Sequence, residues 1–127
     1  DLRSTKEDFR MVKLDIDRIF FEATLPTNFI GATYLKKAIY IAFRNQDLLK
    51  DNKQLIKVVS RLLKVQPSAV RGAIDYYIDY INNFLDMDCL FNVLGPITDN
   101  RNLSTKYMID LCVNYLNRKY YFSTHNL

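Results

Sequence analysis

Apolar residues recur at intervals of three and four along most of the chain, which is the spacing of one face of an α-helix. The clearest case runs from Val70 to Ile81, where apolar positions fall at i, i+3, i+4, i+7, i+8 and i+11. We find no convincing alternation of apolar and polar residues of the kind that a half-buried strand shows. The pattern therefore predicts an all-α protein.

The spacing predicts six helices, separated by residues that end or begin helices. Pro26 interrupts the first apolar stripe, and the polar stretch 44–47 ends the second. A short break at 64–66 precedes Pro67, which the first turn of a new helix tolerates. Gly95-Pro96 ends the fifth helix, and Ser104-Thr105 caps the sixth. The apolar faces lie within 9–23, 35–42, 55–63, 70–81, 87–94 and 107–116.

Length and composition favour one compact, intracellular domain covering residues 1–127. The chain is 49% hydrophobic and 25% charged, which suits a globular core and excludes a disordered segment. Its apolar runs are too short to span a membrane, and its polar start has no signal-peptide core, so we expect a cytoplasmic protein. Because it opens with Asp1, we expect a piece of a longer protein. Cys89 and Cys112 lie within apolar patterns and are expected to be reduced core thiols.

The candidate chemistry for catalysis is poor, and we expect no enzyme, no cofactor and no metal site. The one histidine, His125, stands in a polar tail. Asp15 and Asp17 are two residues apart, so on a helix they do not share a face, and the same holds for Asp86 and Asp88. No glycine-rich phosphate loop, nucleophile elbow or paired Cys/His metal spacing is present.

The net charge of +4 is distributed unevenly along the chain. Six basic residues and one acid, Asp51, lie between Lys50 and Arg71. Four aspartates then follow from Asp75 to Asp88, with no basic residue up to position 100. Solvated helix faces would explain both runs, and binding to nucleic acid would explain the first equally well.

The segment from about 52 to 82 has the organisation of a helix-turn-helix, two helices joined by a tight break. Its first helix carries Lys53, Lys57, Arg61 and Lys64 between apolar positions, which suits a helix lying near the phosphate backbone. Its second helix is long enough to enter a major groove, and a helix N-terminus favours phosphate. An ordinary helical hairpin remains the alternative. In either case we expect Val70, Ile74 and Ile78 to be buried against Leu55, Val59 and Leu62.

Residues 25–39 (LPTNFIGATYLKKAI) resemble a signature of the C-terminal effector domain of the sporulation master response regulator, the stage-zero A protein of spore-forming Firmicutes. The matching positions are Pro26, Gly31, Tyr34, Leu35, Ala38 and Ile39. Residues 68–74 (SAVRGAI) are similar to the family's recognition helix, and Leu90-Phe91 with the capped last helix is a weaker echo. Together the resemblance covers roughly residues 14–119.

The resemblance implies a six-helix effector domain whose helix-turn-helix regulates transcription by binding double-stranded promoter DNA. In the family, a phosphorylated receiver domain precedes the effector domain and controls the pairing of two copies on the site. This chain contains no receiver domain, and pairing with a second copy or a related effector domain is expected. The candidate DNA-binding residues are Lys57, Arg61, Lys64, Gln66, Ser68, Ala69, Arg71, Gly72, Asp75 and Tyr76.

The chain departs from the family on the face that would read DNA. Ala69, Gly72 and Asp75 stand where the family has arginines, while Arg71 replaces a glutamate. One hypothesis is that the domain reads a different sequence through Gln66, Ser68, Arg71 and Tyr76. The other is a degenerate relative, a protein–protein interaction module that modulates a true family member. Asp75, at i+4, would favour the second by holding Arg71 in an ion pair.

Overall fold

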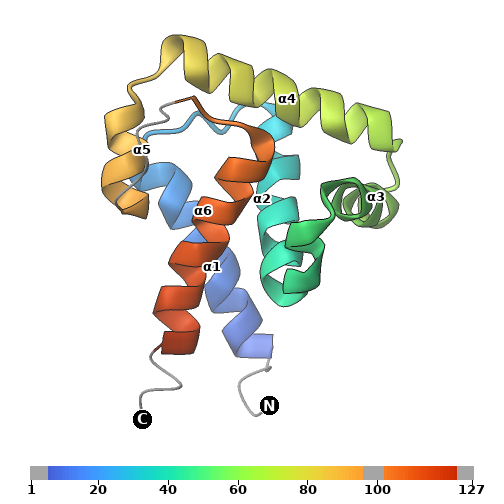
Figure 1. Ribbon diagram of the computed structural model, residues 1–127, viewed down its shortest axis with the longest axis horizontal. Helices are drawn as coiled ribbons and strands as arrows, with labels where there is room; N and C mark the ends of the chain where they lie inside the picture. Colours follow the sequence, from blue (N-terminus) through green and yellow to red (C-terminus); the bar gives the residue numbers. More distant parts are fainter. Residues whose placement is uncertain (1–5, 96–101, 123–127) are drawn as a thin grey trace.

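The computed structural model describes residues 6–95 and 102–122, and within these ranges the protein is all-α, without a strand (Figure 1). A short 3₁₀ segment, η1 (Gln46–Lys50), lies between the second and third helices, and a π-helical turn, η2 (Arg118–Phe122), follows the sixth. The prediction of six helices in one domain is confirmed. The helices are α1 (Lys6–Glu22), α2 (Ile30–Arg44), α3 (Asn52–Leu63), α4 (Pro67–Phe84), α5 (Met87–Leu94) and α6 (Thr105–Asn117).

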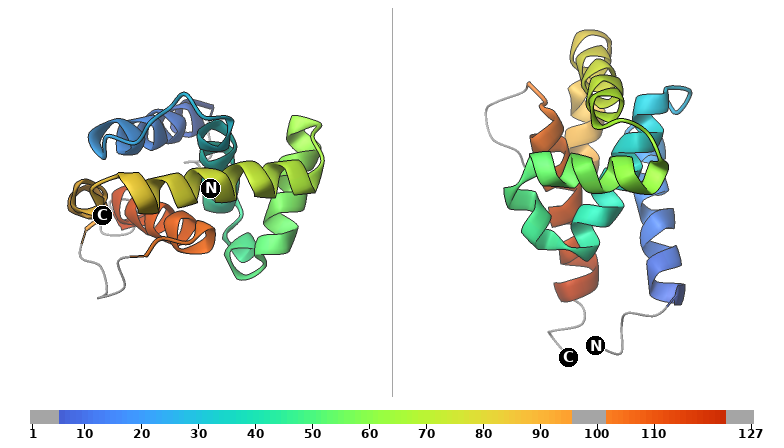
Figure 2. Two further views of the ribbon diagram at one scale, coloured as in Figure 1. Left: turned by 90° about the horizontal axis from the view of Figure 1, so that it is seen from above. Right: turned by 90° about the vertical axis from the view of Figure 1, so that its right-hand side faces the viewer.

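Helix α4 lies across one end of the molecule, over the ends of α2 and α6 (Figure 1). Helix α3 crosses the N-terminal part of α4 rather than running alongside it, as the view from above shows (Figure 2). Helices α1 and α6 pack against each other, and α1 begins and α6 ends at the side of the molecule opposite α4. The α3–α4 pair therefore lies at the outside of the bundle.

The packing of α4 on α3 follows the predicted faces at every position but one. Val70, Ile74 and Ile78 are 0%, 0% and 3% exposed, which confirms the core face of α4. Leu62 was expected in this contact but is 61% exposed. The buried face of α3 is turned toward Ile56 and Ser60, so Leu62 falls at its edge in the last turn.

The crossing of α2 and α4 requires a glycine at position 31. A Cβ atom at Gly31 would lie 2.1 Å from the carbonyl oxygen of Ala73, so the two backbones are in direct contact. Beside this crossing, Tyr77 Oη donates a hydrogen bond to the carbonyl oxygen of Pro26 at 2.6 Å. Burial raises the pKa of Tyr77, which keeps this hydroxyl protonated as a donor. Pro26 and Gly31, two residues of the 25–39 motif, thus help to seat α4.

A buried carboxylate joins the beginning and the end of the described chain. Asp15 is 2% exposed and accepts hydrogen bonds from Lys119 Nζ at 2.8 Å and from the Tyr120 hydroxyl, with Arg18 Nη1 at 3.4 Å. Asp17, two residues later, is exposed and pairs with Lys36 instead. The two acids therefore face different surroundings, as their spacing predicts.

Both cysteines are free thiols, but only one belongs to the core. Cys112 is fully buried in α6, and burial raises the pKa of its thiol. Cys89 is half-buried, contrary to expectation, because the short helix α5 buries Leu90 and Leu94, and position 89 lies to the side of that face. None of the helices in the described ranges is long and apolar enough to cross a membrane. His125 lies outside the described residues.

Candidate nucleic-acid interface

The turn between α3 and α4 is three residues long and begins with an unusual lysine. Lys64 has φ 59° and ψ 43°, the left-handed conformation that glycine normally supplies at the end of a helix. The N–H of Val65 donates to the carbonyl oxygen of Ser60 at 3.0 Å, which closes the end of α3. A side chain in this conformation costs about 1 kcal/mol relative to glycine. The turn therefore carries a lysine at a position where glycine would make the protein more stable.

Helix α4 begins at the end of this turn with an open N-terminus. Pro67 takes the first helical position, and Gln66 precedes it without making a side-chain capping hydrogen bond. The first N–H groups of a helix have no acceptor within the helix, and they carry the positive end of its dipole. Gln66, Pro67 and Ser68 are all exposed. This end of α4 is therefore accessible to an anion.

The basic residues of α3 form one exposed row that leads to the turn. We call Lys53, Lys57, Arg61 and Lys64 the basic row; they follow each other at helical spacing, and all four are exposed. None of them makes an ion pair with another residue in the described part of the chain. The predicted exposed basic side of the first helix is confirmed.

The candidate reading residues on α4 are exposed as well, so all ten candidate DNA-binding residues lie at the surface. Those from Lys57 to Gly72 flank the turn, whereas Asp75 and Tyr76 lie further along α4, beside Thr105 and Phe29. Gly72 is open to solvent: a Cβ atom there would meet no atom within 4 Å. Packing within the protein therefore gives no reason for glycine at this position, in contrast to Gly31.

The structure corrects one interpretation of Asp75. Its Oδ1 accepts a hydrogen bond from Thr105 Oγ1, at the start of α6, at 2.9 Å. No ion pair between Arg71 and Asp75 is present, because Asp75 is oriented toward α6. Arg71 is exposed and has no ion-pair partner in the described ranges. Its guanidinium is thus available to a ligand.

The C-terminal half of α4 carries an aromatic cluster that the sequence analysis did not identify. Phe29 lies 6.1 Å from Tyr76 and 4.8 Å from Tyr80, and Tyr80 lies 5.0 Å from Phe84, between ring centroids. Tyr76 and Phe84 remain 65% and 72% exposed. We call Phe29, Tyr76, Tyr80 and Phe84 the aromatic surface. The spacing 76, 80 and 84 is the signal that was available, since residues four apart are neighbours on a helix.

Comparison with known proteins adds no assignment to this geometry: no family model and no curated protein matches the chain.

Proposed function

We propose that this protein is a helix-turn-helix domain of a bacterial transcription regulator that binds double-stranded promoter DNA in the cytoplasm. The observation that carries the proposal is the basic row, free of ion pairs, which leads through Lys64 into the open N-terminus of α4. The resemblance of residues 25–39 and 68–74 to the sporulation effector domain points the same way.

The basic row and the α4 N-terminus supply affinity that does not depend on sequence. Each lysine or arginine that neutralises a phosphate releases counterions from the duplex, so affinity falls as salt rises. The N–H groups at the start of α4 add a site that favours a phosphate oxygen. Together these groups would orient α4 so that its first residues reach the base edges in the major groove.

Sequence preference would come from the first turns of α4. Arg71 is the exposed residue there that can donate two parallel hydrogen bonds to guanine, while Gln66 and Ser68 can bond other base edges. The bare backbone at Gly72 permits a close approach between the helix and the duplex.

Replacing Lys57 and Arg61 together with alanine should weaken binding to all duplexes similarly. The plot of log affinity against log salt concentration should flatten by about one unit for each phosphate that is no longer neutralised. Fluorescence anisotropy with duplexes of unrelated sequence at several salt concentrations measures both effects. The matched control, Arg10→Ala with Lys106→Ala, removes the same charge from α1 and α6 and should change the salt slope little. Equal salt slopes for the parent and the Lys57/Arg61 variant would mean that these two residues are only solvated and do not contact the DNA phosphates.

Arg71→Ala should cost about 1–3 kcal/mol on the preferred site, selected from random duplexes, and leave binding to unrelated duplex nearly intact. Arg71→Lys is the sharper comparison, because it keeps the charge but loses the paired donors. We expect the lysine variant to lose its preference for the selected site over unrelated duplex almost as fully as the alanine variant does. Uniform weakening on all sequences would instead make Arg71 a phosphate-binding residue.

The alternative function, a protein–protein interaction module acting on a related effector domain, is favoured by the aromatic surface. Exposed aromatic side chains are typical anchors of protein interfaces, and Asp75 and Asp79 on the same helix would repel a phosphate backbone. The duplex titrations separate the two functions. If the parent protein binds no duplex at low salt, the domain does not bind DNA. The aromatic surface is then the favoured site, as a protein–protein interface.

A further inference from the structure

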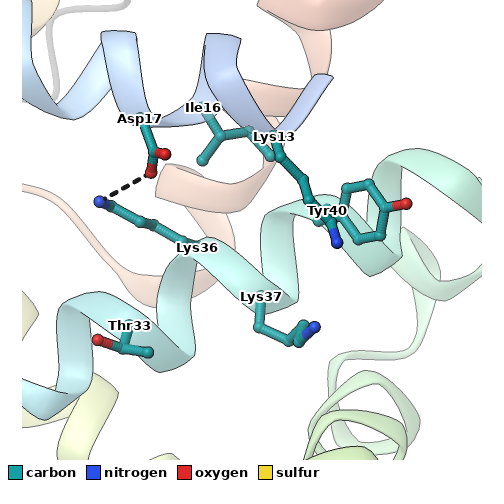
Figure 3. Close-up of a pocket in the computed structure, with 7 residues that line it drawn as sticks. All are labelled: Lys13, Ile16, Asp17, Thr33, Lys36, Lys37 and Tyr40. Carbon is teal, nitrogen blue, oxygen red and sulfur yellow. Dashed lines mark ion pairs between the residues drawn. The ribbon is translucent and has the colours of Figure 1, made fainter. Parts of the chain in front are cut away.

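A groove with a volume of about 370 Å³ lies between α1 and α2 (Figure 3). Small-ligand pockets begin at about 300 Å³, so this space exceeds what a lone inorganic phosphate would fill. None of its lining residues belongs to α3 or α4, and the sequence analysis singled out none of its lysines. The lining residues are Lys13, Ile16 and Asp17 from α1, and Thr33, Lys36, Lys37 and Tyr40 from α2.

Three lysines face one acid in this groove, and only one of them is paired. Lys36 Nζ lies 3.0 Å from Asp17 Oδ1, as the dashed line in Figure 3 marks. Lys13 and Lys37 make no ion pair with any residue that the structure describes. The groove therefore has an excess of positive charge that an anion would relieve.

A further cation, Arg44, does not line the groove but lies beside the ring of Tyr40. Lys13 Nζ lies 4.9 Å from the ring centroid of Tyr40, and the guanidinium carbon of Arg44 lies 5.6 Å from it. Arg44 is exposed and also has no ion-pair partner in the described ranges. Arg44 lies closer to Phe9, whose ring centroid is 4.1 Å from its guanidinium carbon, so Lys13 is the cation of the two that a ligand in the groove would meet.

The floor of the groove is apolar, unlike its rim. Ile16 is 2% exposed and Tyr40 is 9% exposed, so both side chains are part of the packed core where they border the groove. Because so little of either side chain is accessible, and Lys13 Nζ lies over the Tyr40 ring, the floor offers a ligand only a small apolar area. The ammonium groups of the rim are suitable point charges for phosphate, and they therefore supply the recognition.

We propose that this groove binds a nucleotide-sized phosphorylated ligand, with Lys13 and Lys37 holding the phosphates and the rest of the ligand lying along the groove between α1 and α2. The site does not depend on the proposed DNA binding, because the two surfaces share no residue. The same phosphate chemistry could come from a nucleic-acid backbone, and the experiment below separates that source from a free nucleotide.

Calorimetric titration with ATP at low salt tests the site, with ATP as the probe for its class. Lys13→Ala with Lys37→Ala should weaken ATP binding at least about tenfold, whereas Lys50→Ala with Lys106→Ala, which removes two exposed lysines elsewhere, should leave it unchanged. Asp17→Asn should tighten binding, because it removes the acid of the groove and frees Lys36. Lys13→Arg with Lys37→Arg keeps the charge and should retain most of the affinity, which separates lost binding from lost folding.

The position of the ligand is checked by nuclear magnetic resonance. The amide signals of Thr33 and Tyr40 should shift on addition of ATP, while those of the α3 basic row should not. Failure to bind ATP at millimolar concentration, or equal affinity in the parent and the Lys13/Lys37 alanine variant, overturns the proposal. A loss of duplex affinity in that variant without any ATP binding would also overturn it, and would assign both lysines to the DNA backbone.

Discussion

Gly31→Ala should lower the free energy of unfolding by about 3 kcal/mol or more, the upper part of the range for overpacked sites. The added Cβ would lie 2.1 Å from the Ala73 carbonyl oxygen and 2.9 Å from Tyr77 Cβ. The nearest atoms belong to backbone, so the clash is relieved only if α2 and α4 move apart. That movement would also disturb the hydrogen bond between Tyr77 and Pro26. Urea unfolding followed by circular dichroism measures the loss.

The same substitution at Gly72 is the control, and its sign should be opposite. Gly72 lies within an exposed helix and has no neighbour within 4 Å of its added Cβ. Alanine there should stabilise the protein by about 0.5–1 kcal/mol, because glycine loses more backbone freedom on folding. A Gly31→Ala protein as stable as the parent would mean that α2 and α4 do not approach as described.

Ile74→Ala should destabilise the protein by about 2–5 kcal/mol, since a fully buried side chain is replaced by a cavity. Ile74 lies at the middle of the α4 core face, between Val70 and Ile78. Leu62→Ala is the matched control: it removes a leucine from the neighbouring helix that is 61% exposed, and it should change stability by no more than about 0.5 kcal/mol.

Thermal and urea unfolding of both variants measure the loss of stability and so test which of the two side chains is buried. A large loss for Leu62→Ala together with a small loss for Ile74→Ala would contradict the packing of α3 on α4. Duplex binding of Leu62→Ala should stay close to that of the parent, because the substitution leaves the basic row intact.

The helices and their ends could be predicted well from local sequence, because the determinants act within a few residues. The predicted fifth segment has the bounds that α5 shows, Met87–Leu94. Ser104 caps α6 as expected, with its hydroxyl accepting from the Tyr107 N–H at 3.1 Å. The η1 segment was missed, since a polar stretch such as 44–47 indicates an end to α2 and does not specify the turn that follows.

The contacts that could not be predicted join residues far apart in the chain. Asp75 meets Thr105 thirty residues later, and Gly31 meets Ala73 in another helix. Periodicity shows which face of a helix is apolar, but it does not show which other helix that face will meet. The groove was missed for the same reason: Lys13 and Lys37 lie on separate predicted helices, and the periodicity of either segment does not indicate that the two helices meet there. The exposure of the candidate interface was predictable because it depends on single-helix faces.

The buried carboxylate of Asp15 determines where this protein can be shortened. A chain ending at Asn117 would keep all six α-helices but lose Lys119 and Tyr120, leaving Arg18 as the remaining partner of that carboxylate. A carboxylate that stays buried after losing most of its hydrogen-bonding partners costs several kcal/mol of stability. The shortest stable chain therefore extends past α6 to Lys119 and Tyr120, because these residues hydrogen-bond to the carboxylate of Asp15 in α1.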